Sequence, residues 1–234
     1  MKKQMLIITL ALLLLATPIL AYQANVTGTQ TYIAYAQYAA TNETGTYALH
    51  VRDAVPATYS TTVTIRNTTD DNIISTIYTT SLNINAQSIF YNGESWYLNR
   101  YDSNIHYKIN NSNASDADIG SFDYENDYCT YGRYDKVYCL DARYNTTHAR
   151  WSRYAPDDLT TAEHDTLIPI DALGHLTATV TGLGSYEDLF IINNNSLTDT
   201  LIIIDYIGTY KGVIDVEDVA GTDMRGAAYD HEEG

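Results

Sequence analysis

Residues Phe190–Ile204 read FIINNNSLTDTLIII, an apolar run followed by a polar stretch and a second apolar run. Short runs of β-branched and aromatic residues, bounded by Asn, Ser and Asp, are typical of two antiparallel strands joined by a turn. Residues Val63–Ile77 follow the same plan, because VTIRN leads through polar residues to IISTI. After Ala21, no apolar stripe with the 3.6-residue period of a helix lasts for three turns. The sequence therefore predicts an all-β fold built from many short strands.

These two hairpins resemble those of immunoglobulin-like domains in secreted archaeal and bacterial cell-surface proteins. In such domains a strand ends in Asn-Asn or Asn-Gly and its partner strand is rich in Thr and Val. The resemblance rests on Val63–Ile77 and Phe190–Ile204. It implies an immunoglobulin-like antiparallel β-sandwich at a cell surface, and we expect this domain to span residues 22–218.

The distribution of tyrosine divides the expected sandwich into parts. Residues 22–90 and 165–218 are expected to be two related halves, while residues 88–155 hold the tyrosine concentration. We interpret this middle part as Tyr-rich hairpins inserted in the sandwich, or as a separate small domain. One helical turn is expected at Pro156–Asp158, where an Asp side chain can cap the first amides. Residues 219–234 have few apolar groups and are expected to form a flexible acidic tail.

Residues 1–21 have the pattern of a secretory signal peptide. Lys2 and Lys3 form a positive start, Met5–Leu15 is almost purely apolar, and Ala21 suits the last position before cleavage. The alternative is a retained membrane anchor, but the apolar stretch is at the lower limit of the roughly 17–25 residues that span a bilayer. No second long apolar run follows. We expect an extracellular, cell-surface protein with no transmembrane segment after signal cleavage.

The cysteine and asparagine patterns agree with export. Cys129 and Cys139, the only cysteines, are expected to form a disulfide in an oxidising compartment. A metal site at this pair is the alternative, but no His or Cys ligand lies between them. Candidate glycosylation sites occur wherever the chain reads Asn-x-Ser/Thr, at Asn25, Asn42, Asn67, Asn110, Asn113, Asn145 and Asn194.

The charge balance excludes several classes of partner. The 234 residues include 13 Lys and Arg against 29 Asp and Glu, which gives a formal net charge of −16. Nucleic acids and anionic membrane surfaces are bound by basic patches, so neither is an expected partner. Hydrophobic residues make up 45% of the chain, enough to fill a core, so disorder throughout the chain is not expected.

Tyrosine is the leading functional signal, because the chain has 22 Tyr against 3 Phe and 2 Trp. A tyrosine offers a rigid apolar face and one hydroxyl, which suits stacking on sugars or packing against another subunit. The alternative is that tyrosine, a good strand former, simply fills the sheets. The candidate ligand-binding or interface residues are Trp96, Tyr97, Tyr101, Trp151 and Tyr154.

A cluster of acidic residues suggests a calcium site, since Ca²⁺ takes several oxygen ligands from a loop. Its candidate ligands are Asp116, Asp118, Asp123, Glu125 and Asp127. The alternative is a solvated acidic loop that binds no metal. No other cofactor is expected.

The chain carries no serine-nucleophile or phosphate-loop signature, and we predict no catalytic residues and no enzymatic activity. We expect a cell-envelope or surface-appendage protein, such as a filament subunit, that acts by self-association or adhesion, alone or with other envelope proteins. The segment Tyr22–Ala40 contains an uncharged strand that could pair with a neighbour's sheet edge, or could be the first strand of its own sheet. The alternative function is a carbohydrate-binding module with Tyr and Trp platforms. A secreted hydrolase with paired acids is the third hypothesis.

Overall fold

The computed structural model describes 17 β-strands, and no helix occurs within the residues it describes. These residues are 22–23, 36–41, 46–52, 61–67, 72–78, 86–100, 103–109, 114–169, 180–186, 188–194 and 200–215. Within these ranges, nothing is long, helical and apolar enough to cross a membrane. The predicted signal peptide and the predicted acidic tail both lie outside the described residues.

The strands form four sheets, and apart from the short strand β1 the strands of each sheet are antiparallel and follow one another in chain order. Blade 1 contains β2 (Ala36–Thr41), β3 (Thr46–Arg52), β4 (Thr61–Asn67) and β5 (Ile73–Tyr78). Blade 2 contains β6 (Ala86–Tyr91), β7 (Trp96–Arg100), β8 (Ile105–Ile109) and β9 (Ala114–Ser121). Blade 3 contains β10 (Tyr128–Gly132), β11 (Lys136–Asp141), β12 (His148–Ala155) and β13 (Asp158–Pro169). Blade 4 contains β14 (Val180–Tyr186), β15 (Leu189–Asn194), β16 (Thr200–Asp205) and β17 (Tyr210–Asp215).

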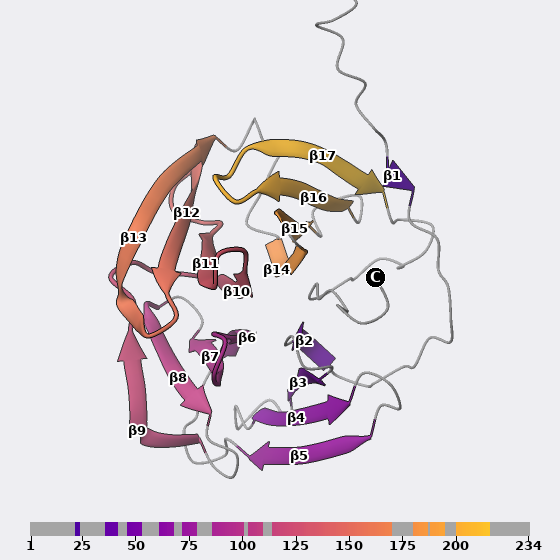
Figure 1. Cartoon of the computed structure of the whole chain (residues 1–234), viewed down its shortest axis with the longest axis vertical. Coiled ribbons are helices and arrows are strands. Elements are labelled where there is room, and N and C mark those ends of the chain that lie inside the picture. The colour runs from indigo at the N-terminus through magenta and orange to yellow at the C-terminus, as the bar shows by residue number, and fades with distance from the viewer. Residues whose placement is uncertain are drawn as a thin grey trace, which may run out of the picture.

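The four sheets stand around a common axis (Figure 1). The first strand of each blade is innermost, because β2 contacts β6, β6 contacts β10, and β10 contacts β14. The last strand of each blade lies at the periphery, and a short strand β1 (Tyr22–Gln23) pairs in parallel with β17. Radial four-stranded sheets that each begin at the axis and end at the rim are the blades of a β-propeller.

This arrangement confirms the all-β, antiparallel part of the prediction and corrects the rest. An immunoglobulin-like sandwich has two facing sheets, whereas here four sheets pack side by side around an axis. The Tyr-rich middle is not a set of inserted hairpins, because residues 86–169 form blades 2 and 3, which have the same four-stranded plan as their neighbours. The part of the segment Tyr22–Ala40 that lies in β2 pairs with β3 of its own blade, and residues 24–35 lie outside the described residues.

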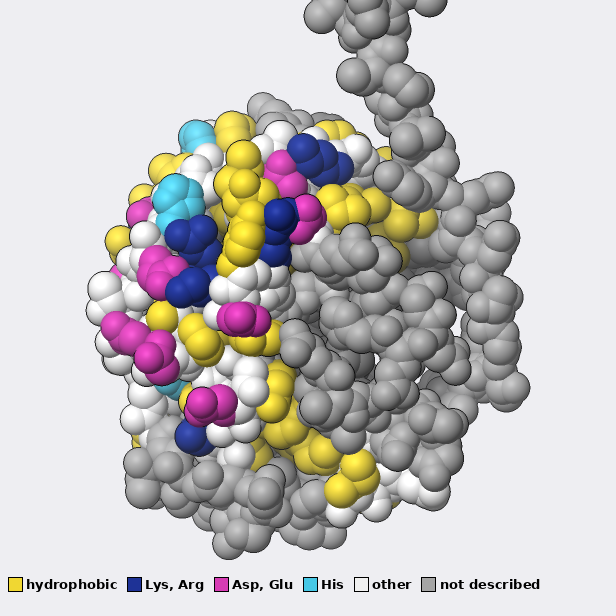
Figure 2. All heavy atoms as spheres, viewed as in Figure 1, with side chains coloured by type: hydrophobic (Ala, Val, Ile, Leu, Met, Phe, Trp, Pro, Cys, Tyr) yellow, Lys and Arg dark blue, Asp and Glu magenta, His cyan; other side chains and the backbone are white. Residues whose placement is uncertain are grey.

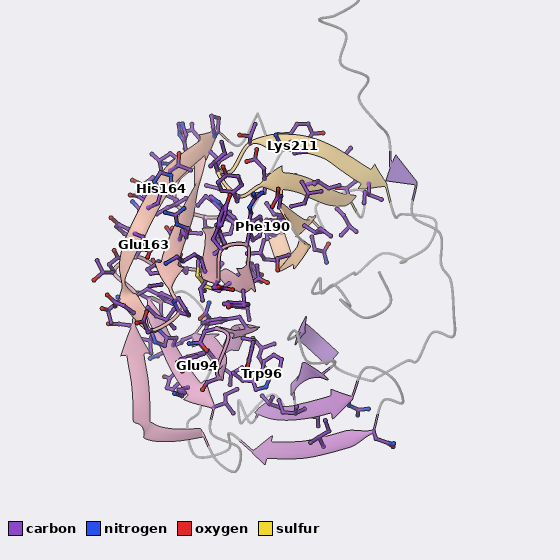
Figure 3. The ribbon with its side chains drawn as sticks, in the orientation of Figure 1. Glu94, Trp96, Glu163, His164, Phe190 and Lys211 are labelled. Carbon is purple, nitrogen blue, oxygen red and sulfur yellow. A yellow bond between two sulfur atoms is a disulfide. The ribbon has the colours of Figure 1, made fainter. Side chains whose placement is uncertain are left out.

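A separate hydrophobic core fills each interface between successive blades. Side chains alternate along a strand, so blade 2 turns Leu98 toward blade 1 and Tyr97 toward blade 3. Likewise Tyr154 of β12 joins the core shared with blade 2, while Trp151, three residues earlier on the opposite face of the strand, joins the core shared with blade 4. Phe190 of β15 lies between blades 3 and 4 (Figure 3). Blades 2 and 3 are thus buried on both sides by their neighbours.

The two hairpins that decided the fold class are present as predicted. Phe190 pairs with Ile204 in β15 and β16, and Val63 pairs with Ile77 in β4 and β5. The helical turn expected at Pro156–Asp158 is wrong, because Pro156 and Asp157 form the turn between β12 and β13. The strand pairing on both sides of this turn outweighs the capping signal.

Candidate functional site

The connections between strands lie on two opposite faces of the propeller, because the strand direction alternates within each blade. We call turn face the one that carries the β6–β7, β10–β11, β12–β13, β14–β15 and β16–β17 turns. Contacts hold these turns together across blades: the Asn92 side chain donates to the carbonyl of Pro156 at 2.6 Å, and Arg133 forms an ion pair with Asp188. We call crossover face the opposite one, which carries the β9–β10 connection and the β11–β12 turn.

A platform of two tyrosines and an arginine joins blades 3 and 4 on the turn face. The Arg133 guanidinium lies 4.4 Å from the ring centroid of Tyr134 and 5.1 Å from that of Tyr206. The two rings meet edge to face, with their centroids 5.6 Å apart. The ion pair with Asp188 fixes the guanidinium from the blade 4 side. We refer to Arg133, Tyr134, Asp188 and Tyr206 as the tyrosine–arginine platform.

The turn that presents this platform is held in an unusual backbone conformation. Tyr134 has φ 61° and Asp135 has φ 53°, in the left-handed region that non-glycine residues seldom adopt. Each such residue costs on the order of 1 kcal/mol, so the turn is not the most stable one available. Tyr131 donates a hydrogen bond from its hydroxyl to Asp135 at 3.1 Å and ties the turn to β10. Tyr134 is more than half exposed, at 55%.

The cations around the platform are paired with acids. Glu163 accepts from Lys136 at 2.6 Å and lies 3.4 Å from Arg153, and Lys211 lies 2.8 Å from Asp205. Figure 2 shows dark blue cationic side chains beside magenta acidic ones over blades 3 and 4. The outer strand β13 carries Glu163 and His164 at the rim, away from the axis (Figure 3). The platform is therefore an aromatic surface in locally balanced charge, on a chain whose net charge is −16.

An acidic and basic cluster occupies the crossover face, where the β9–β10 connection meets the β11–β12 turn. Asp127 is almost fully buried, and it accepts from Arg143 Nη2 at 2.5 Å and from the amide of Ala142 at 3.1 Å. Glu125 lies 3.9 Å from the same guanidinium. Asp141 accepts from the amide of Arg143 at 3.0 Å. Burial, and then the neighbouring charge of Asp127, raise the pKa of Asp141 to about 6.

A second arginine on this face is enclosed by two tyrosine rings. The Arg150 guanidinium lies 4.0 Å from the ring centroid of Tyr124 and 4.1 Å from that of Tyr144. Tyr124 belongs to the β9–β10 connection and Tyr144 to the β11–β12 turn, while Arg150 is on β12. The face therefore carries a stacked guanidinium next to the cluster of Arg143 and its acids.

The aromatic residues predicted to bind a ligand are mostly core residues. Trp96, Tyr97, Trp151 and Tyr154 are all buried, with exposures between 0% and 9%. Their flat side chains fill the inter-blade cores, which apolar burial favours over exposure. They do not form the exposed platform that the prediction required. Tyr101 lies outside the described residues.

The acidic residues predicted to bind calcium have other partners where they are described. Asp123 accepts from the Tyr154 hydroxyl at 2.8 Å and from the amide of Ala162 at 3.0 Å. Asp127 and Glu125 face Arg143, as described above. The side chains of Asp116 and Asp118 are outside the described residues. Among the side chains that the structure does place, no three His, Cys, Asp or Glu come together as a metal site.

The predicted disulfide is confirmed: Cys129 and Cys139 are bonded and pair across β10 and β11. Of the predicted glycosylation sites, only Asn145 has a described side chain, and it is exposed. Its Oδ1 accepts from the amide and the hydroxyl of Thr147, at 2.8 and 2.9 Å. The side chains or whole residues of Asn25, Asn42, Asn67, Asn110, Asn113 and Asn194 are outside the description.

Sequence reasoning missed the residues that form the tyrosine–arginine platform. Arg133, Tyr134, Asp188 and Tyr206 were not among the residues predicted to bind a ligand. An exposed tyrosine at the tip of a turn is a recognisable signal, because a turn tip cannot bury a large ring in its own blade. Tyr206 could not be linked to it by sequence, since the two belong to different blades.

Comparison with known proteins supports the fold. No protein-family model matches the chain, and no curated protein matches it in sequence. The crystal structure of Myxococcus xanthus glutaminyl cyclase is similar, with a TM-score of 0.60 and 15% identity, over 86% of this chain and 83% of that chain. A Bacteroides caccae protein of unknown function is similar with a TM-score of 0.53 and 11% identity, over 85% of this chain and 74% of that one. At such identities the likeness concerns the fold.

The first of these neighbours corrects one sequence-based prediction. The chain was expected not to be an enzyme because it carries no catalytic signature, yet a solved structure of the same fold is an enzyme. Catalytic groups of a propeller come from connections far apart in the sequence, so the lack of a short motif does not exclude catalysis. The prediction that excluded enzymatic activity for this chain is therefore wrong.

Proposed function

We propose that this chain is an exported β-propeller that adheres to extracellular glycans through the tyrosine–arginine platform on its turn face. The observation that carries the proposal is Tyr134, an exposed ring held by a left-handed turn against Tyr206 and Arg133. A protein retains local backbone strain where the strained geometry is used. The signal peptide and the candidate glycosylation sites support an extracellular location and a glycoprotein.

The chemistry of the platform fits a sugar ring. A tyrosine face packs against the C–H groups of a pyranose, and its hydroxyl remains able to hydrogen-bond. Arg133 and Asp188 border the rings and supply donors and acceptors for ring hydroxyls. Fixing the rings and the guanidinium against one another before binding lowers the entropy that a ligand must overcome.

The test is binding of the mature protein to an array of neutral and acidic glycans, repeated with Tyr134→Gly. Glycine accepts a positive φ without strain, so this variant should be at least as stable as the wild type. It lacks the exposed ring, so its glycan binding should fall by on the order of tenfold or more. Stability and binding should therefore change in opposite directions.

Asp135→Gly is the matched control. It relaxes the same turn at the neighbouring left-handed residue but keeps the Tyr134 ring, so binding should be largely retained. An array with no bound glycan would contradict the proposal, as would equal binding by wild type and Tyr134→Gly. Loss of dimers or filaments in Tyr134→Gly without any glycan binding would replace adhesion with self-association as the function of this surface.

A second candidate function is the cyclisation of an amino-terminal glutaminyl residue. What favours it is the fold shared with glutaminyl cyclase over most of both chains. Such a reaction needs a proton-transfer group near the substrate. Glu94 is an exposed carboxylate in the β6–β7 turn, beside Trp96 and next to the innermost strand of blade 2 (Figure 3).

The assay for this candidate is incubation of the mature protein with a peptide that begins with glutamine. Cyclisation would appear in the mass spectrum as loss of one ammonia, and Glu94→Gln should abolish it. Glu163→Gln, at the rim of blade 3, is the control and should leave it unchanged. No turnover above the uncatalysed rate would rule this candidate out.

A further inference from the structure

We infer that Arg150, enclosed between Tyr124 and Tyr144 on the crossover face, is a binding site for the carboxylate group of a ligand. This site is on the opposite face from the tyrosine–arginine platform and does not depend on it. Its distinguishing feature is the Arg150 guanidinium, which has an aromatic ring against it from each of two connections. The guanidinium forms no hydrogen bond with a described residue.

The guanidinium of Arg150 lies between two aromatic rings. Its centre lies 4.0 Å from the centroid of Tyr124 and 4.1 Å from that of Tyr144, both within the range of cation–π attraction. The two rings come from separate connections, and the backbone of Arg150 is paired with Asp141 in the sheet of blade 3. The planar group is therefore held in one plane by two rings and one strand.

The donors of this guanidinium have no partner in the described structure. Arg150 forms no hydrogen bond and no ion pair with any described residue, and its Nε is buried without an acceptor. An arginine presents its N–H donors in a rigid planar fork, and a buried donor left unpaired costs about 1–3 kcal/mol. The two terminal nitrogens of the guanidinium are the donors that a ligand carboxylate can pair with.

The described acidic side chains nearby form their hydrogen bonds and ion pairs with Arg143 and with backbone amides, and none of them forms a hydrogen bond with Arg150. Asp127 receives two hydrogen bonds from Arg143 and one from Ala142, and Glu125 is nearest to the same arginine. Asp141, the cross-strand partner of Arg150, accepts from the Arg143 amide instead. Arg143 is therefore the hydrogen-bonding or ion-pair partner of these acids, while Arg150 acts on Asp141 only through the attraction of its charge, with no hydrogen bond to it among the described residues.

The fork geometry selects a planar carboxylate. Two parallel N–H donors match the two oxygens of a carboxylate in a bidentate pair, a geometry that the ammonium group of lysine cannot reproduce. The rings of Tyr124 and Tyr144 extend the apolar surface on both sides of the guanidinium. An acidic sugar such as a uronic acid presents a carboxylate on a ring that those tyrosines can contact.

The experiment is a nitrogen–proton NMR titration of the mature protein with glucuronate, and in parallel with glucose. The Nε–H resonance of Arg150 should be visible because that nitrogen is shielded from solvent, and Arg150→Lys identifies it by its disappearance. Glucuronate should shift this resonance with a saturable curve. Glucose, which lacks the carboxylate, should leave it unchanged.

Saturation-transfer signals from glucuronate then compare the variants. Arg150→Lys keeps the charge but loses the fork, so binding should weaken by on the order of tenfold. Arg153→Lys, three residues along the same strand, is the matched control and should bind as the wild type does. Tyr134→Gly should also bind normally, which separates this site from the platform.

Three results would overturn the inference: no saturable shift with glucuronate, an equal shift with glucose, or unchanged binding in Arg150→Lys. If Arg150→Lys also loses thermal stability, Tyr144→Phe and Tyr144→Ala provide the second comparison. The phenyl ring keeps the stack and should keep binding, whereas alanine removes one side of the clamp and should weaken it. Equal binding by these two variants would contradict a role for the stack.

Discussion

Blades 3 and 4 meet through a core that is largely apolar, whereas blades 2 and 3 meet through one that mixes aromatic rings with polar groups. At the 3–4 interface, Trp151, Tyr138 and Phe190 pack with ring centroids 4.5–5.7 Å apart. The polar atoms of this core have partners: Tyr128 donates to the carbonyl of Val180 at 2.7 Å, and Trp151 Nε1 donates to a carbonyl at 3.1 Å.

At the 2–3 interface, a polar row crosses blade 2. Ser88, Asn99 and His106 are paired in register on neighbouring strands, and all three are buried. Ser88 Oγ, Asn99 Oδ1 and His106 Nδ1 have no hydrogen-bond partner among the described residues. Asn99 Nδ2 contacts Cys129 Sγ of the disulfide at 3.3 Å.

Two interfaces of the same repeated blade are therefore stabilised in different ways. Unpaired buried polar atoms cost about 1–3 kcal/mol each, so the 2–3 interface gains less from burial than its neighbour. A covalent bond between Cys129 and Cys139 lies in that same interface. We expect the 3–4 core to carry the greater share of non-covalent stability and the disulfide to compensate at the 2–3 core.

The largest effect should come from Trp151→Ala at the 3–4 interface. Trp151 is 1% exposed, and removing its ring leaves a cavity among Tyr138, Phe190 and their neighbours. The free energy of unfolding should fall by about 3–5 kcal/mol, measured by urea denaturation. Trp151→Phe is the control and should lose less. A loss of unfolding free energy below about 1 kcal/mol for Trp151→Ala would contradict a dominant 3–4 core, because so small a loss is typical of an average point mutation.

The next effect concerns the disulfide. Replacing both cysteines with alanine frees a loop of ten residues, and the chain-entropy account predicts a loss of about 2–3 kcal/mol. The measurement is urea denaturation of the wild type and the double variant under non-reducing conditions. Adding reductant should bring the wild type toward the variant and leave the variant unchanged. Identical unfolding curves for the two proteins would show that the bond contributes nothing.

His106 predicts a pH dependence at the 2–3 interface. Burial lowers its pKa from 6.5 to about 4 in the folded state, so the unfolded chain binds a proton that the folded chain refuses. Stability should be fully present above pH 6.5 and should fall, by up to about 3 kcal/mol, as the pH drops toward 4. Below that pH the loss should level off, because the folded state is protonated as well.

The readout is the difference in unfolding free energy between the wild type and His106→Leu at each pH. This difference is needed because Asp141, whose pKa is raised to about 6, adds stability as the pH falls through the same range. His106→Leu should lose the acid-dependent fall while retaining the contribution of Asp141. A difference that stays constant from pH 7 to pH 4 would mean that His106 is not held neutral.

The smallest effect compares one hydroxyl at each interface. Ser88→Ala removes an unpaired oxygen from the 2–3 interface and should leave stability unchanged or raise it by up to about 1 kcal/mol. Tyr128→Phe removes a paired hydroxyl from the 3–4 interface and should lower stability by about 1 kcal/mol. Thermal unfolding of both variants checks the opposite signs, and a shared sign would remove this distinction between the interfaces.

Strand content could be predicted from the sequence because it depends on local patterns. Runs such as Phe190–Asn194 and Val63–Asn67 combine β-branched residues with turn formers, and both are strands. Their assembly could not be predicted from a single hairpin, because alternation shows which side chains are buried but not what packs against them. A global signal does exist: the innermost strands begin at residues 36, 86, 128 and 180, and a recurring unit of this size is typical of propellers.

The candidate sites were harder to predict than the strands. Tyrosine abundance led to the prediction of an aromatic surface, but sequence alone could not separate Trp151, which is buried, from Tyr134, which is exposed. The acidic loop drew attention to Asp127, yet its partner Arg143 comes from another turn and changes the site from a metal cluster to an ion pair. Both errors arise where the decisive contact joins elements that are distant in the chain.

We propose that a glycan binds on the turn face, at the tyrosine–arginine platform. The most direct measurement is amide hydrogen exchange of the mature protein with and without the best-bound glycan from the array. The account predicts slower exchange in the β10–β11 turn around Tyr134 and in the β16–β17 turn around Tyr206, with little change elsewhere. Protection confined to the outer strand β13, or to blade 1, would place the binding surface elsewhere and contradict the account.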